Sequence, residues 1–194
     1  MKTLVIRTVI ITIACIVAVA AIAYILTATV FPGAMADVYG NLGAYEKAAA
    51  YKTRAYESGG RIEDLAAASE YAVKSGDDKL IVSTVEKLIE DEAFAFYRAE
   101  NGGRVGFLTA RYVVAGYAVS GAEDALIDKA FSLLIGYGTH NEVESLIVAA
   151  YDKGDKDALI KIKSRLEDID VGSLSEADKK VLDNDKALIE EGIK

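Results

Sequence analysis

The fold follows from a segment that the chain repeats, YAVKSGDDKLI over residues 71–81. The same pattern returns as YAVSGAEDALI at residues 117–127 and as AYDKGDKDALI at residues 150–160. Each copy places a glycine between an apolar segment and a charged stretch that leads into a second apolar segment. A repeat of this kind indicates one supersecondary unit used several times. The unit predicted here is a pair of helices joined by a turn.

The turn glycines set the spacing of these units. Gly43, Gly76, Gly121 and Gly154 are separated by 33, 45 and 33 positions. Glycine is favoured just past a helix end because it relaxes there into the left-handed conformation. The middle interval is longer than the other two, and we therefore expect an insertion around residues 93–103.

Apolar residues recur at steps of three and four along most of the remaining chain, which has no proline after Pro32. This period is typical of amphipathic helices, and no alternating β-branched run suggests a strand. The expected core faces are Val105, Leu108, Tyr112, Ala115 and Val119, then Leu126, Ala130, Leu133 and Tyr137, then Val143, Leu146, Ile147 and Ala150. We expect a capping box from Thr139 to Glu142, and a terminal capping helix with Leu174, Ala177, Val181 and Leu188 inward.

Residues 43–55, GAYEKAAAYKTRA, resemble the turn and second helix of the tetratricopeptide-repeat family. In that pattern the glycine makes the turn, Tyr45 packs behind it, and Tyr39 and Tyr117 take a packing position in the first helix of a unit. The resemblance spans residues 35–170, without the large aromatic residue and the closing proline that the family's repeats usually carry. It implies an all-α fold: a right-handed α-solenoid of about four helix-turn-helix hairpins over residues 33–194, closed by a C-terminal capping helix.

The N-terminal segment is apolar. Residues 8–31 carry no charge, and a helix of about 20 apolar residues crosses the roughly 30 Å hydrocarbon layer of a bilayer. We therefore predict a transmembrane helix or signal anchor over residues 1–32. Lys2 and Arg7 precede it, which by the positive-inside tendency places the N-terminus in the cytoplasm and the rest of the chain outside, in a single-pass protein of the cell membrane.

Two other interpretations of this segment compete with the anchor. Ala34-Met35-Ala36 has the small-x-small pattern that signal peptidases cleave, although the apolar run is longer than the core of a signal peptide. A lipid-attachment site at Cys15 would need an apolar residue where Thr12 stands. Because Cys15 is the only cysteine, one chain cannot form an internal disulfide.

The composition argues against nucleic-acid binding. Setting aside Lys2 and Arg7 leaves 20 basic side chains against 30 acidic ones, a formal charge of −10 for the rest of the chain. A surface of that sign repels phosphate backbones. No cluster of basic and aromatic residues suggests an exception.

The sequence also lacks the usual marks of an enzyme. His140 is the only histidine, and at a predicted helix start we interpret it as an exposed or turn side chain. The acidic run of residues 152–157 differs from a calcium loop, because Lys163 stands where a bidentate glutamate belongs. We interpret its carboxylates as charges that suit a helix N-terminus. Phosphate-binding, nucleophile-elbow and zinc-protease motifs are missing, and we expect neither catalysis, cofactor nor metal.

If the tetratricopeptide register holds, the first helices present one concave side to a partner. The residues expected there are Glu63, Glu70, Lys74, Arg111, Asn141, Glu144, Val148 and Tyr151. An acidic-leaning groove of this kind suits a basic helix or extended peptide. The alternative binding surfaces are the insertion, with Phe94, Phe96 and Tyr97, and the membrane helix itself. Most of the many tyrosines are expected in the core.

These observations favour a membrane-anchored extracytoplasmic scaffold or adaptor that binds other proteins, including basic peptides or subunits of a membrane complex. Residues 8–31 would contact the lipid bilayer. A second hypothesis is a secreted binding module released by cleavage after Ala36. A third is a structural subunit that self-associates in a membrane complex or filament.

Overall fold

The computed structural model describes residues 2–137, 140–169 and 176–194, with the backbone alone for residues 2–8 and 137. Every regular element in these ranges is a helix, as predicted. The helices are α1 (Lys2–Val30), α2 (Pro32–Asn41), α3 (Tyr45–Gly59), α4 (Ile62–Ser75), α5 (Asp78–Glu90), α6 (Phe94–Glu100), α7 (Gly102–Ser120), α8 (Asp124–Tyr137), α9 (Asn141–Asp152), α10 (Lys156–Glu167) and α11 (Glu176–Ile193).

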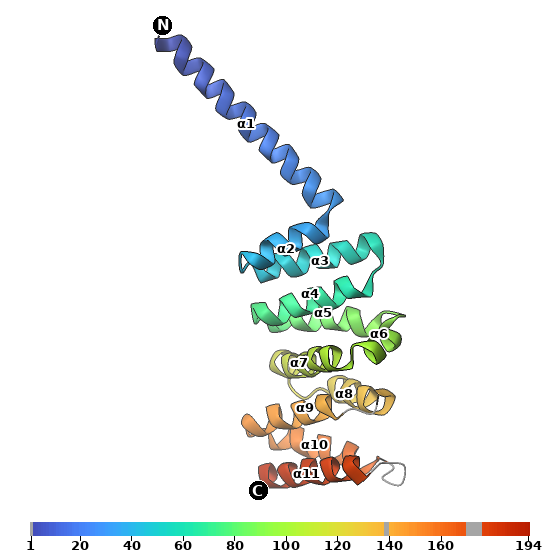
Figure 1. Cartoon of the computed structure of the whole chain (residues 1–194). Coiled ribbons are helices and arrows are strands. Elements are labelled where there is room, and N and C mark those ends of the chain that lie inside the picture. Colours follow the sequence, from blue (N-terminus) through green and yellow to red (C-terminus); the bar gives the residue numbers. More distant parts are fainter. Residues whose placement is uncertain (1, 138–139, 170–175) are drawn as a thin grey trace.

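Helix α1 stands apart from the others. It projects obliquely from one end of the stack formed by α2 to α11, and the two chain termini lie at opposite ends of the molecule (Figure 1). Val9–Val30 is long and apolar enough to cross a bilayer, and every side chain from Val9 to Thr27 is exposed. The expected apolar N-terminal helix is therefore present, and the other described residues leave its side chains exposed from Val9 to Thr27.

The junction between α1 and α2 is short. Phe31 alone separates the two helices, and Pro32 begins α2 in the first-turn position that suits its fixed φ. The Tyr24 hydroxyl of α1 lies 2.8 Å from the Tyr39 hydroxyl of α2 and 3.3 Å from the Tyr51 hydroxyl of α3. The Tyr39 and Tyr51 rings stack with their centroids 5.4 Å apart. Three helices thus meet through three tyrosines.

The predicted turn glycines all lie between consecutive helices. Gly43 (φ 73°), Gly76 (φ 74°), Gly121 (φ 75°) and Gly154 (φ 63°) have positive φ angles that other residues adopt only at a cost. They follow α2, α4, α7 and α9 respectively, as their spacing predicted. Asp77 and Asp155 then cap the next helices, accepting hydrogen bonds from the Leu80 and Ala158 backbone N–H groups.

Each helix of the stack packs against its neighbours along the chain. Helix α3 contacts α2 and α4, α5 contacts α4 and α7, and α9 contacts α7, α8, α10 and α11. The predicted core faces of α7, α8 and α9 are buried, with Val119 the exception at 47% exposed. The Tyr137 side chain lies outside the described residues. The period of three and four was therefore a reliable guide to the inward face of these helices.

The prediction for the terminal helix was wrong by about one residue. The inward positions of α11 are Leu182, Asp185 and Ile189, whereas Val181 and Leu188 are half-buried and Ala177 is exposed. Leu174 lies outside the described residues. The sequence pattern favoured the wrong face because Asp185, a charged residue, occupies an inward position, where carboxylates are rarely found.

The insertion between the second and third turns forms α6, which is part of the core. Phe94 is 3% exposed and Tyr97 4% exposed, so only Phe96 of the three predicted contact residues points outward, at 69%. The Arg98 guanidinium of α6 forms a 3.0 Å ion pair with the Glu142 carboxylate of α9, and both side chains are buried. Burial of a charge is costly unless it is paired in this way.

The predicted capping box at the start of α9 involves Thr139 and therefore stays a prediction. Thr139 lies outside the described residues, His140 occupies the cap position, and α9 begins at Asn141. The Glu142 carboxylate accepts hydrogen bonds from Arg98 and from the Thr109 hydroxyl of α7. Glu142 therefore joins three helices inside the molecule, where a capping glutamate would lie at the surface.

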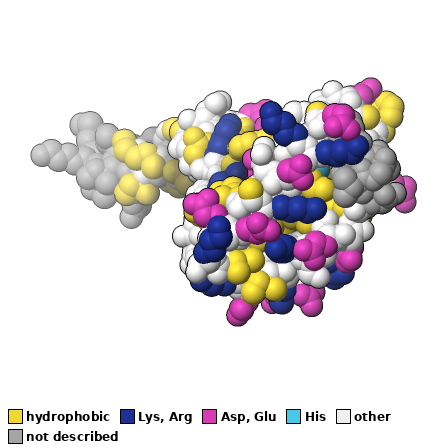
Figure 2. Space-filling view, turned by 90° about the horizontal axis from the view of Figure 1, so that it is seen from below, with side chains coloured by type: hydrophobic (Ala, Val, Ile, Leu, Met, Phe, Trp, Pro, Cys, Tyr) yellow, Lys and Arg dark blue, Asp and Glu magenta, His cyan; other side chains and the backbone are white. Residues whose placement is uncertain are grey.

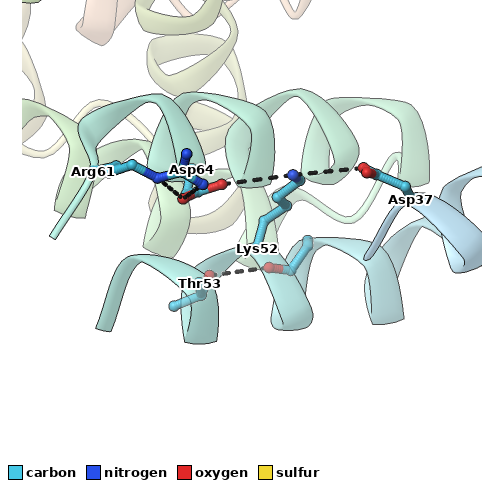
Figure 3. Close-up of polar contacts among 6 residues, drawn as sticks. Asp37, Lys52, Thr53, Arg61 and Asp64 are labelled. Atoms are coloured by element: carbon cyan, nitrogen blue, oxygen red, sulfur yellow. Dashed lines mark hydrogen bonds and ion pairs between the residues drawn. The ribbon is translucent and has the colours of Figure 1, made fainter. Parts of the chain in front are cut away.

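Polar contacts tie the first three helices of the stack together. The Lys52 ammonium of α3 lies 3.5 Å from an Asp37 carboxylate oxygen of α2 and 3.6 Å from one of Asp64 in α4. Arg61 also pairs with Asp64, at 2.7 Å. Figure 3 shows Lys52 between the two carboxylates. Because Asp64 is buried, these two cations offset the cost of placing its charge there.

Candidate interaction surface

The predicted partner-binding residues come from three helices that contact one another in sequence. Helix α4 carries Glu63, Glu70 and Lys74, α7 carries Arg111, and α9 carries Asn141, Glu144, Val148 and Tyr151. Helix α7 contacts both α4 and α9. The three helices therefore lie next to one another, but some of the predicted side chains contact other residues of the chain and others are exposed.

The α4 residues are partly engaged within the molecule. The Glu70 carboxylate accepts a hydrogen bond from Arg104 of α7, which also donates to the Tyr97 hydroxyl at 2.8 Å. This bond to Glu70 raises the pKa of the Arg104 guanidinium. Glu63 is exposed on the same face of α4, and Lys74 lies over the Tyr71 ring, 5.4 Å from its centroid. Glu70 therefore links helices and is a poor choice for a partner contact.

Arg111 and Asn141 lie at the packing line between α7 and α9. Arg111 is half-buried, and its Nε atom has no hydrogen-bond partner among the described residues. The exposed Asn141 places its amide nitrogen over Gly106 of α7, 3.4 Å from where a Cβ would stand. A larger residue than glycine at position 106 would press against this amide.

Glu144 and Val148 form the most open part of this surface. They lie one turn apart on α9 and line a shallow depression of about 280 Å³ together with Val114, Ser145, Ala149 and Asp152. Val148 is 41% exposed. The floor is apolar and the rim carries two carboxylates, the combination that a side chain with an apolar stem and a cationic end can fill.

Tyr151 faces the end of the stack. Its hydroxyl lies 3.2 Å from a Glu191 carboxylate oxygen of α11, and its ring comes within 2.9 Å of where a Cβ on Gly192 would stand. The bond to Glu191 raises the pKa of the Tyr151 phenol. Tyr151 therefore helps to seat the terminal helix and has one edge left for other contacts.

Charges on the molecular surface are mixed. Acidic and basic side chains are interspersed over the face at the C-terminal end of the stack, with hydrophobic side chains between them (Figure 2). Ion pairs of this kind join neighbouring helices, as between Lys161 and Asp124 at 3.1 Å and between Arg165 and Asp128 at 2.7 Å. On this face, basic side chains therefore accompany the acidic ones.

The acidic residues that the sequence analysis compared with a calcium loop form contacts within the fold. Asp155 caps α10 and accepts a hydrogen bond from the Tyr117 hydroxyl at 2.8 Å. The bond from the Ala158 backbone and that from Tyr117 lower the pKa of Asp155, while burial and this carboxylate raise the pKa of Tyr117 to about 12. Within the described ranges no three histidine, cysteine or acidic side chains gather as a metal site would require.

His140 occupies the turn at the start of α9, one of the two expected placements, and its side chain is not exposed. Its side chain is 10% exposed, and its Nε2 atom lies 3.7 Å from an Asp178 carboxylate oxygen of α11. The sequence did not predict the burial of Asp185 of α11, which has a carboxyl oxygen without a hydrogen-bond partner in the part of the chain described. Burial, and then the charge of Glu144, raise the pKa of Asp185 to about 6. The burial of Asp185 follows from the contact between α9 and α11, and the periodicity of the sequence does not predict it.

Comparison of the chain with protein-family models, with curated proteins and with solved structures gave no match.

Proposed function

We propose that the chain is a single-pass membrane protein whose helical stack lies outside the cytoplasm and holds partner proteins as a scaffold or adaptor. The observation that carries the proposal is α1: an apolar helix long enough to cross a bilayer, with its side chains exposed from Val9 to Thr27. Exposing so many apolar side chains to water is unfavourable, and a bilayer removes them from it.

The arrangement of the remaining helices supports a tetratricopeptide-like α-solenoid. Among the described residues five glycines with positive φ lie between consecutive helices, and four of them, Gly43, Gly76, Gly121 and Gly154, are at the predicted turns. Helices α4, α7, α9 and α11 each contact the next, as the first helices of successive units would. Helix α6 is then the insertion, and α11 closes the end. An elongated stack of this kind offers a long surface for partners, which suits a scaffold.

The depression between α7 and α9 is the proposed contact for a partner. It combines the exposed Val148 with the carboxylates of Glu144 and Asp152. We infer that it accepts a basic helix or extended peptide. The insertion is less well supported as a partner-binding surface, because Phe94 and Tyr97 are buried.

Cleavage after Ala36 is less well supported than retention of the anchor. Ala36 lies inside α2 and is fully buried, and Pro32 and Met35 are buried with it. Removal of residues 1–36 would delete half of α2 and these core contacts. The secreted form would then start with an exposed α3 surface.

The anchor and its direction are tested by a reporter fused after Lys194 in intact cells. If Lys2 and Arg7 stay in the cytoplasm, a reporter that works only outside it is active, and the fusion sediments with membranes. Mass spectrometry of the same fusion, finding a chain that begins at Asp37, would favour the secreted module. A reporter active only in the cytoplasm would reverse the proposed direction.

The proposed contact is tested by partner recovery from solubilised membranes. The double variant Glu144→Lys/Val148→Lys reverses one rim charge and fills the depression, and recovery of partners should fall several-fold. The matched control Glu167→Lys/Ile160→Lys makes the same changes at exposed positions of α10. Circular dichroism should be unchanged in both. Equal recovery by the two variants would place the contact elsewhere, and recovery of further copies of the chain alone would favour the self-associating subunit.

A further inference from the structure

Helix α2 carries an apolar stripe that no part of the described chain covers. Phe31 is 63% exposed, Val38 51% and Leu42 74%. Phe31 precedes α2 at its N-cap with non-helical backbone angles, and Leu42 follows α2 at its C-cap. With about 100° of rotation per residue, Val38 and Leu42 are about 40° apart around the helix. Of the buried positions of α2, Pro32 and Ala36 are about 80° and 120° around the helix from Leu42, whereas Met35 is only about 20° from it. The exposed apolar residues therefore border the face that α2 packs into the stack.

Part of the stripe lies towards the side of α2 that contacts the membrane helix. Tyr39 contacts α1 through Tyr24, and Leu42 is about 60° from Tyr39 around the helix. The opposite side faces the stack: Asp37 pairs with Lys52 of α3, and Gly40 packs against the Tyr71 ring of α4. Leu42 is about 140° from Asp37 and about 160° from Gly40. Leu42 is therefore nearer the side of α2 that contacts α1 than the side that faces α3 and α4, while Val38 is about 100° from both Tyr39 and Asp37.

Helix α3 adds tyrosine and basic residues to this side. Lys47, Tyr51 and Arg54 lie at steps of four and three, so they share one face. Tyr51 contacts Tyr24 of α1, Lys47 lies 5.3 Å from the Tyr39 ring centroid and Arg54 lies 5.5 Å from that of Tyr51. Tyrosine rings with lysine and arginine beside them are the residues that anchor proteins at the level of lipid headgroups.

We propose that α2 and the Lys47–Arg54 face of α3 lie in the interfacial layer of the bilayer that α1 crosses, with Phe31, Val38 and Leu42 among the upper acyl chains. This rests on the proposed anchoring of α1. A bilayer fits the stripe because the two are continuous: one residue separates α1 from α2. An amphipathic helix beside a membrane span buries its apolar side in this layer. The apolar residues supply the affinity, so the excess of negative charge elsewhere does not oppose it.

The chain has no tryptophan, so single-tryptophan variants report depth directly. We would reconstitute the full-length chain in phosphatidylcholine vesicles whose lipids carry bromine, a fluorescence quencher, either high on the acyl chain or near its end. The Leu42→Trp variant tests the stripe. Ile16→Trp in α1 reports the anchor, and Ile160→Trp in α10 is the matched exposed position far along the stack, at 51%.

The expected result is strong quenching of Leu42→Trp by the shallow bromine, several-fold more than of Ile160→Trp, and quenching of Ile16→Trp chiefly by the deep bromine. Quenching of Ile16→Trp without quenching of Leu42→Trp would overturn this inference and leave the anchor intact. No quenching of Ile16→Trp would instead overturn the anchor. A Leu42→Trp emission that is blue-shifted but not quenched would assign the stripe to a second copy of the chain and also overturn the inference.

Discussion

Among single residues, the buried pair of Arg98 and Glu142 has the largest expected effect on stability. Removing one member leaves the other charge buried without this opposite charge beside it, which costs about 3–5 kcal/mol. We therefore expect Arg98→Ala to lower the free energy of unfolding by about that amount. The measurement is urea denaturation of the full-length chain in detergent, followed by circular dichroism.

The double variant Arg98→Met/Glu142→Leu separates the charge effect from lost packing. It removes both charges and keeps apolar volume, so it should be considerably more stable than the single variant. The surface pair of Lys161 and Asp124 is the control, since removal of an exposed pair changes stability by about 1 kcal/mol or less. Equal losses in the single and double variants would mean that packing, and not the loss of the opposite charge, sets the cost.

The buried carboxyl of Asp185 makes stability depend on pH. An ordinary aspartate has a pKa of 3.8, and in the folded protein that of Asp185 is raised to about 6. Its contribution to stability is therefore complete below pH 3.8 and is lost as the pH rises through 6. The difference between these two pKa values corresponds to roughly 3 kcal/mol of destabilisation of the folded protein at neutral pH.

We accordingly expect Asp185→Asn to raise the free energy of unfolding by up to about 3 kcal/mol at pH 7, and by less than about 1 kcal/mol at pH 4. Urea midpoints at the two pH values measure this. The neighbouring Asp183 is exposed, and Asp183→Asn should give nearly the same small change at both. An equal gain at both pH values for Asp185→Asn would show that the carboxyl does not titrate in this window.

At the scale of helices and turns, Gly76 tests the geometry of the repeated unit. Its φ of 74° is left-handed, and a Cβ there would meet no other atom within 4 Å. Gly76→Ala should thus cost about 1–2 kcal/mol through the backbone alone. Gly136 also has free space but lies within α8, so Gly136→Ala should instead gain up to about 1 kcal/mol. Thermal unfolding of both variants gives the signs, and a loss of stability in both would contradict this account.

Helices and turns were predictable from the sequence because their causes are local. The period of the apolar residues in α7 and α9 and the glycines at 43, 76, 121 and 154 act over a few positions. Failures occurred where distant residues decide the outcome. The burial of Glu142 was not predicted because its partner Arg98 is 44 positions away, and the inward face of α11 depends on a buried acid that no apolar pattern reveals.

The candidate surface was predictable only as a set of helices. The helical periodicity of the sequence correctly predicted that Glu63, Glu144 and Val148 are exposed. It did not show that Glu70 is held by Arg104 or Tyr151 by Glu191, since those partners are 34 and 40 positions away. Which side chains remain available to a partner depends on the packing between helices. This packing cannot be predicted from the periodicity of a single sequence.

For the whole molecule, α11 is expected to keep the stack soluble at its far end. Leu182 and Ile189 are buried, and Leu159 of α10 packs where a Cβ on Gly192 would stand. A chain that ends at Ile169 exposes this apolar layer, and an uncovered end of a helical stack favours self-association. Analytical ultracentrifugation in detergent should show larger species than for the full-length chain.

The control for this truncation keeps the helix and changes its outer side. Asp183→Ala on α11 is exposed and should sediment as the unaltered chain does. A truncated chain that sediments as expected for its own smaller mass would mean that α10 ends the stack without help from α11.

The junction at Tyr24, Tyr39 and Tyr51 also restricts how the molecule can turn. A flexible tether would let the stack swivel and sample many orientations above the lipid, whereas here a one-residue connection and the contacts among three hydroxyls restrict its rotation about α1. If α1 crosses a bilayer and the α7–α9 depression binds partners, as proposed, the depression keeps a limited range of directions and heights above the lipid. A partner in the same membrane would then meet it by a two-dimensional search over few orientations, an advantage that a partner diffusing freely in solution would not gain.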